Sequence, residues 1–247
     1  MDALRMRIPG AEFVYIADRE GFPYGRRTRE EVRDIILDRT ERIVSKFMPD
    51  LVVVACNTAS QASLDALRIR FPDTLFVGTV PAVKPAAEST RTGVIAVMST
   101  DRAAVDPYLD WLVERWARGV RVIRLGAQAL VEFVERDFLD ASVEDRRSAC
   151  REALEPIRGS GADRVVLACT HFLHVADFIA EEAGPSVCVV DSREGVASRA
   201  AELVHRSLAT GGIEGRVSAL YATGASHGWT GLDRFARVSG LAFGGAL

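Results

Sequence analysis

The chain has 247 residues, 48% of them hydrophobic, and a formal net charge of −3. This composition excludes a mainly disordered chain and allows one large or two small domains with a full core. Lysine and arginine are spread along the sequence, so we expect no nucleic-acid partner. No run reaches the roughly 18 apolar residues that a membrane span needs, and no export signal is present, so we expect a cytoplasmic protein without a membrane partner.

The first part of the sequence predicts a helix, a strand and a second helix. Residues 1–9 are typical of the last turns of a helix, residues 12–16 alternate as in a strand, and residues 17–25 have the glycine and proline content of a loop. Thr28 and Glu31 form a capping-box pattern, after which apolar residues recur at helical spacing. This order begins a β-α-β arrangement.

A short apolar run, residues 51–55, leads directly to Cys56 and indicates a buried strand. The same pattern returns 113 residues later, where an apolar run leads to Cys169. The first copy continues as Asn57-Thr58-Ala59 and the second as Thr170-His171-Phe172. The repeat therefore indicates two related half-sites, each led by a cysteine and followed by a helix.

The rest of the sequence continues the alternation of helices and strands. Helices are predicted over 60–70, 99–116, 129–138, 142–157, 172–183 and 194–208, and strands over 75–77, 93–97, 120–123, 187–190 and 218–222. Two prolines in residues 79–85 indicate a crossover between domains, and glycines in 211–215 predict a turn. Such alternation predicts an α/β fold of two pseudo-symmetric parallel-sheet domains, with the active site in the cleft between them.

The two repeated cysteines suggest acid–base chemistry at a carbon atom. The ends of parallel strands meet helix N-termini, where unpaired N–H groups lower the pKa of a cysteine and favour its thiolate. Two thiols on opposite faces of one carbon can remove a proton and return one, which is a two-base racemisation. Cys56 and Cys169 are the candidate bases, while Asn57, Thr58 and Thr170 are candidates to hold a small amino-acid substrate.

Other interpretations of these residues stay open. A cysteine at a strand end is often a small buried hydrophobe, and we expect that role for Cys150 and Cys188. Cys169, His171 and His174 offer metal-ligand types, but no motif supplies the remaining ligands, so no metal is expected. His171 is better explained as a proton partner of Cys169, and His174 as a surface or packing residue.

Three more features of the sequence bear on its chemistry. The Pro23–Gly25 turn either connects a strand to a helix or contacts a substrate. Asp18 could act as a base, although a loop aspartate more often bonds nearby backbone groups. A pyridoxal enzyme needs a Schiff-base lysine, and neither Lys46 nor Lys84 lies in a convincing motif, so no such cofactor is expected.

The chain resembles the glutamate racemases, cofactor-independent enzymes that supply D-glutamate for bacterial peptidoglycan. The resemblance is carried by Ala55-Cys-Asn-Thr-Ala-Ser60 and Ala168-Cys-Thr-His171, with support from Pro23-Tyr-Gly25, Val80-Pro-Ala-Val-Lys-Pro-Ala86, Asp191-Ser192 and Tyr221-Ala-Thr-Gly224. It implies that Cys56 and Cys169 are the two bases and that His171 assists the second. It also implies substrate contacts from Tyr24, Gly25, Asn57, Thr58, Thr100 and Thr170.

The resemblance further implies a first domain of residues 1–79 plus 193–247 and a second of residues 80–192. Because dimers are common in the family, it also suggests a homodimer. It implies no cofactor, and a small amino acid as the partner molecule.

Two departures from the family pattern qualify this expectation. The family opens with a strand and an Asp-Ser-Gly loop, and this sequence begins downstream of both, so we expect an upstream coding segment. Val97 stands where the family usually has a substrate-contacting threonine, so substrate preference could differ. A racemase of aspartate or hydantoins, and a catalytically silent binding protein with the same fold, are therefore the alternatives.

Overall fold

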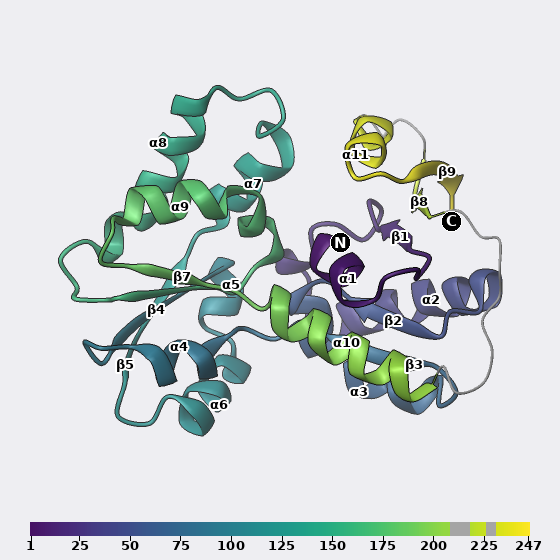
Figure 1. The fold of residues 1–247 in the computed structure, drawn as a ribbon, viewed down its shortest axis with the longest axis horizontal. Coiled ribbons are helices and arrows are strands. Elements are labelled where there is room, and N and C mark those ends of the chain that lie inside the picture. The colour runs from purple at the N-terminus through teal and green to yellow at the C-terminus, as the bar shows by residue number, and fades with distance from the viewer. Residues whose placement is uncertain (208–217, 226–230) are drawn as a thin grey trace. The chain divides into compact units, whose positions relative to one another are not determined.

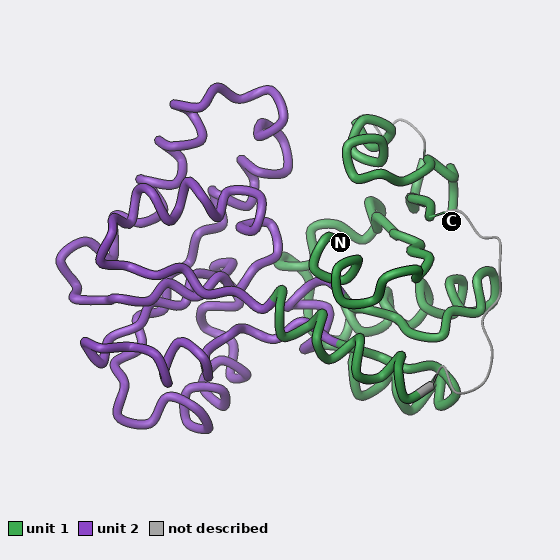
Figure 2. Tube along the Cα trace, viewed as in Figure 1, with its two compact units in different colours: residues 1–54, 62–77, 193–247 green, residues 55–61, 78–192 purple. Residues whose placement is uncertain are grey.

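The computed structural model describes residues 1–207, 218–225 and 231–247 (Figure 1). They form two compact units (Figure 2). Unit 1 comprises residues 1–54, 62–77 and 193–247, and unit 2 comprises residues 55–61 and 78–192. The predicted domain limits stay a prediction, and the predicted glycine turn at 211–215 lies outside the described residues.

Unit 1 contains two sheets with helices packed on them. Its elements are α1 (Asp2–Arg7), β1 (Val14–Ala17), the 3₁₀ helix η1 (Tyr24–Arg26), α2 (Arg29–Phe47), β2 (Leu51–Val54), most of α3 (Asn57–Arg70), β3 (Leu75–Gly78), α10 (Arg193–Ser207), β8 (Ala219–Ala222), α11 (Leu232–Val238) and β9 (Ala242–Ala246). One sheet has the order β1-β8-β9, with parallel pairing throughout, and the other pairs β2 with β3.

The capping box predicted at the start of α2 is confirmed. Thr28 Oγ1 accepts a hydrogen bond from the Glu31 N–H at 3.2 Å, and the Glu31 carboxylate accepts one from the Thr28 N–H at 2.7 Å. These bonds satisfy two of the backbone N–H groups that the first turn leaves unpaired. The helix ends at Phe47, and its C-cap Met48 has the left-handed conformation, just before the predicted stop at Pro49.

Unit 2 is built on one four-stranded sheet of order β5-β4-β6-β7, in which every pair is parallel. Its elements are α4 (Val83–Ser89), β4 (Val94–Ser99), α5 (Asp101–Ala104), α6 (Pro107–Trp116), β5 (Arg121–Gly126), α7 (Gln128–Arg136), α8 (Val143–Leu154), η2 (Glu155–Ile157), β6 (Arg164–Leu167), η3 (Thr170–Val175), α9 (Ala176–Ala183) and β7 (Cys188–Val190).

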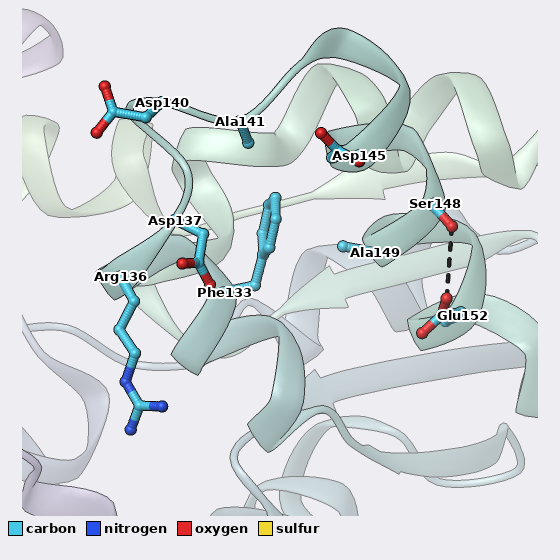
Figure 3. Close-up of a pocket in the computed structure, with 9 residues that line it drawn as sticks. All are labelled: Phe133, Arg136, Asp137, Asp140, Ala141, Asp145, Ser148, Ala149 and Glu152. Atoms are coloured by element: carbon cyan, nitrogen blue, oxygen red, sulfur yellow. Dashed lines mark hydrogen bonds between the residues drawn. The ribbon is translucent and has the colours of Figure 1, made fainter.

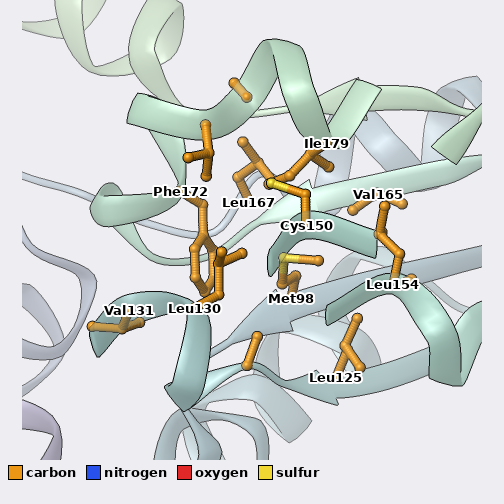
Figure 4. Close-up of a cluster of buried hydrophobic side chains, with 14 of the residues drawn as sticks. Met98, Leu125, Leu130, Val131, Cys150, Leu154, Val165, Leu167, Phe172 and Ile179 are labelled. Atoms are coloured by element: carbon orange, nitrogen blue, oxygen red, sulfur yellow. The ribbon is translucent and has the colours of Figure 1, made fainter. Parts of the chain in front are cut away.

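Helices cover both faces of this sheet, because alternate residues of the central strand β4 point to opposite sides. Ala96 and Met98 belong to a core cluster with residues of α7, α8 and α9, part of which Figure 4 shows. Ile95 and Val97 belong to a second cluster, with residues of α4 and α6. The four side chains are fully buried, so β4 is apolar on both faces.

The predicted fold class, α/β with parallel sheets, is confirmed, while several boundaries differ. The helix expected over 99–116 is divided into α5 and α6, because Asp106 caps a new helix whose first residue is Pro107. The helix expected over 172–183 begins as η3 and becomes α9. Helix α4 and strand β9 were not predicted, since the prolines of 81–85 and the glycines of 244–245 indicate loops.

Candidate active site

The sequence repeat is also a structural repeat. Strand β2 ends at Val54 and β6 ends at Leu167, and each is followed two residues later by a cysteine. The next element begins at Asn57 in the first copy and at Thr170 in the second. All these positions keep the 113-residue offset, so Cys56 and Cys169 occupy equivalent places between a strand and a helical turn. Both cysteines belong to unit 2.

Cys169 heads a chain of three side chains. Its Sγ lies 3.5 Å from Nδ1 of His171, and the Nε2 of that ring lies 3.2 Å from Oε2 of Glu135. Glu135 comes from α7, 34 residues before the thiol in sequence, and no motif in the sequence pointed to it. The arrangement allows the imidazole to exchange a proton with the thiol while the carboxylate orients the ring.

The surroundings of His171 favour its protonated form. Burial by itself lowers the pKa of this imidazole, but the hydrogen bonds and negative charges of Cys169 and Glu135 outweigh burial and raise it to about 9. A protonated His171 therefore persists at neutral pH between a sulfur atom and a carboxylate.

Cys56 is held in a different way. Burial raises the pKa of its thiol to about 11, and the nearby charge of Cys169 adds to this effect. Hydrogen bonds from the backbone of Ala59 and Thr58 and from the Thr58 side chain oppose it without reversing it. The predicted lowering of the pKa is therefore wrong for Cys56, because loss of hydration outweighs the helix N-terminus. Because the charge of Cys169 acts on the thiol of Cys56, the two sulfur atoms lie near each other.

Four of the residues predicted to bind a substrate follow the carboxyl ends of β2, β4 and β6: Asn57, Thr58, Thr100 and Thr170. Asn57 is 4% exposed, and its Oδ1 is buried without a hydrogen-bond partner. Thr58 bonds to Cys56, and Thr170 begins η3 directly after Cys169. Thr100 follows β4, which pairs with β6, and its hydroxyl caps α5 by accepting the Ala103 N–H at 3.2 Å.

Tyr24 and Gly25 lie in unit 1, in the short helix η1. The Tyr24 hydroxyl donates a hydrogen bond of 2.5 Å to Asp18. Asp18 also accepts the backbone N–H of Gly21 at 3.3 Å, which is the local bond expected of a loop aspartate. The structure thus joins Tyr24 to a carboxylate of its own unit.

Other residues singled out in the sequence lie elsewhere. Cys150 is fully buried, as predicted, in the core cluster of α8 (Figure 4). Cys188 is exposed rather than buried, because β7 is an edge strand of its sheet. His174 is exposed, with its ring 6.0 Å from that of Phe138, as expected for a surface residue. Val97 packs fully buried in the second core cluster.

A cavity of about 530 Å³ lies between α7 and α8, and none of the predicted site residues lines it (Figure 3). Its lining residues are Phe133, Arg136, Asp137, Asp140, Ala141, Asp145, Ser148, Ala149 and Glu152. Among the described residues, no group of three His, Cys, Asp or Glu side chains is arranged to hold a metal ion. In the same part of the chain, no helix is long and apolar enough to cross a membrane.

Comparison with known proteins agrees with this arrangement. Residues 2–200 match the family model described as Asp/Glu/Hydantoin racemase. A glutamate racemase of Roseiflexus sp. is 39% identical over 201 residues, covering 81% of this chain and 73% of that protein. One of Sphingopyxis alaskensis is 41% identical over 201 residues, covering 81% and 75%. The structure of Escherichia coli glutamate racemase in complex with L-glutamate and the activator UDP-MurNAc-Ala superposes with a TM-score of 0.90 at 28% identity, covering 100% of this chain and 92% of that chain.

The fold and these matches define an enzyme of the amino-acid racemase class. More particularly, the chain belongs to the Asp/Glu/hydantoin racemase family.

Proposed function

We propose that this protein interconverts L-glutamate and D-glutamate by a two-base mechanism in which Cys56 and Cys169 are the bases. The substrate is suggested by the names of the relatives, which are glutamate racemases. The observation that best supports the mechanism is that the two equivalent cysteines of the repeat belong to unit 2 and lie close enough for the charge of Cys169 to act on the thiol of Cys56.

The two thiols have different neighbours, and this difference assigns their resting roles. Cys56, with its raised pKa, keeps its proton and is the acid. His171 carries its own proton 3.5 Å from the Cys169 sulfur, so we assign the base to this sulfur. In the reverse direction the roles exchange. After a forward step Cys56 is the thiolate and Cys169 is the thiol, so Cys56 is then the base and Cys169 the acid.

In the forward step, the Cα–H bond of glutamate breaks and its proton goes to the Cys169 thiolate. The electron pair stays on the substrate, delocalised into its carboxylate. A proton from the Cys56 thiol then forms a new Cα–H bond on the opposite face, leaving Cys56 as the thiolate. His171, held by Glu135, compensates the charge of the Cys169 thiolate until the proton arrives there.

Substrate binding is assigned to Tyr24, Gly25, Asn57, Thr58, Thr100 and Thr170. The buried Oδ1 of Asn57 lacks a partner, which normally costs free energy, so an ammonium group that donates to it would relieve that cost. We assign the substrate ammonium to this oxygen. The threonine hydroxyls can donate to a carboxylate.

The decisive experiment follows the α-proton by ¹H NMR in D₂O, with L-glutamate and D-glutamate in separate samples. We expect the α-proton signal to disappear in both samples. The circular dichroism signals of the two samples, which start with opposite signs, should both decay to zero. Cys56→Ser and Cys169→Ser should abolish the change, whereas Cys188→Ser, at the exposed cysteine, should retain it. Retention of the α-proton in both samples would overturn the proposal. Faster exchange of aspartate or a hydantoin would reassign the substrate.

The proposed reaction makes D-glutamate from L-glutamate. D-Glutamate would supply peptidoglycan synthesis, as the family resemblance implies. A homodimer is the proposed assembly, and light scattering coupled to size-exclusion chromatography measures it directly.

A further inference from the structure

Four segments of unit 1 meet at the side chain of Asp18. This residue directly follows β1. Its carboxylate accepts hydrogen bonds from the Tyr24 hydroxyl at 2.5 Å, from Nε of Arg39 on α2 at 3.1 Å, and from the hydroxyl of Thr223, which directly follows β8. The Asp18 and Arg39 side chains are only 10% and 14% exposed, so this ion pair is largely removed from water.

The packing around Asp18 leaves no space for a side chain at residue 21. A side chain at Gly21 would overlap the Asp18 carboxylate, and its Cβ would lie 2.8 Å from the Tyr24 ring. The hydroxyl of Thr223 also accepts the Glu20 N–H at 3.1 Å, and Arg27 Nε donates to the Gly21 carbonyl at 2.8 Å. The loop between β1 and η1 is therefore tied to the sheet at several points, with the Asp18 carboxylate at their centre.

Unit 2 contains a second buried aspartate with the same kinds of partner. Asp163 accepts from the Thr90 hydroxyl at 2.5 Å and from the Arg91 N–H at 2.7 Å, and it pairs with Arg164 at 3.2 Å. However, Asp163 directly precedes β6, at the amino end of its sheet. Ligands of open parallel sheets bind at the carboxyl ends of the strands, which is where Asp18 lies. The two aspartates thus share their chemistry and differ in location.

We propose that Asp18 is a positioning residue for glutamate binding: through Tyr24 it fixes the turn that presents Tyr24 and Gly25 to the substrate. This inference rests on the proposed function, which assigns substrate contacts to that turn. A turn that is already ordered loses less conformational entropy when a ligand binds, so the expected effect is on affinity rather than on the proton-transfer steps. Asp163, at the other end of its sheet, should contribute to stability alone.

The test compares Asp18→Asn with the matched Asp163→Asn in the full chain. Asp18→Asn should raise KM for glutamate about tenfold, as expected for one lost charge-assisted hydrogen bond, and should change kcat by less than about twofold. Asp163→Asn should lower the melting temperature and leave KM unchanged. Tyr24→Phe should also raise KM, and the effects of Asp18→Asn and Tyr24→Phe should not add in the double variant, because both act on the bond between these two side chains.

Amide hydrogen exchange gives a measurement that does not depend on activity. Exchange in residues 20–27 should become faster in Asp18→Asn and in Tyr24→Phe, and should not change in Asp163→Asn. An active Asp18→Asn enzyme with unaltered KM, or unaltered exchange in residues 20–27, overturns the inference. If the wild-type protein does not exchange the α-proton of glutamate, the proposed function fails, and the exchange experiment still decides whether Asp18 fixes the turn.

Discussion

Replacing Glu135 by glutamine tests the proton relay most directly. The substitution keeps the shape of the side chain and removes its charge, 3.2 Å from Nε2 of His171. The pKa of His171 is raised from 6.5 to about 9, a difference worth about 3 kcal/mol at 1.36 kcal/mol per unit. Cys169 and Glu135 both contribute to this shift against the effect of burial. Removing the Glu135 charge should therefore lower the pKa by about one unit, or about 1.4 kcal/mol.

The pKa is measured by titrating the His171 imidazole with ¹H–¹⁵N NMR, and its effect on turnover by the pH dependence of kcat/KM. Both curves should move about one unit toward lower pH in Glu135→Gln, with activity falling by about fivefold at pH 9 and by about tenfold above it. Glu152→Gln, on α8, is the matched control, since Glu152 bonds to Ser148 instead. An identical His171 titration in Glu135→Gln and the wild type would refute the relay.

Three further outcomes concern stability. Burial raises the pKa of Asp18, but bonds led by those from Thr223 and Tyr24 lower it overall, so its contribution is present above about pH 4 and lost as pH falls through the folded value. Melting curves of Asp18→Asn should accordingly depend less on pH below 4, and an unchanged acid limb contradicts this. The contribution of the His171 proton is complete below about pH 6.5 and lost as pH rises through about 9. Urea midpoints should fall over that range in the wild type and not in His171→Gln; equal slopes argue against it. Phe172 is fully buried, so Phe172→Ala should cost about 3–5 kcal/mol in urea unfolding. A loss below about 1 kcal/mol would mean that the core closes around the gap.

Local patterns in the sequence predicted much of this molecule. The apolar runs before Cys56 and Cys169 are short and uninterrupted, and both became strands that end at the same point of the repeat. The capping box at Thr28 needs only two residues three apart, and it formed as predicted. Even the division between α5 and α6 could have been read from Asp106-Pro107, a capping residue followed by a favourable first helical residue.

Long-range relationships could not be predicted from one sequence. Glu135 is one of 34 acidic residues, and only the packing of α7 against η3 brings it to His171. Asp18 meets Arg39 and a threonine 205 residues away, a partnership that no local pattern encodes. The pKa of Cys56 was misjudged for a related reason: its position beside a helix start is visible in sequence, but the burial that outweighs it is a property of the whole fold.

The two halves of the repeat are not chemically equal. Counting 113 residues back from His171 reaches Thr58, so a hydroxyl serves Cys56 where an imidazole serves Cys169. Enantiomers have the same free energy in water, so a racemase must process both with the same kcat/KM, however unlike its two bases are. The inequality between Thr58 and His171 can therefore appear only as compensating differences in kcat and in KM, and in unequal deuterium isotope effects for the two directions.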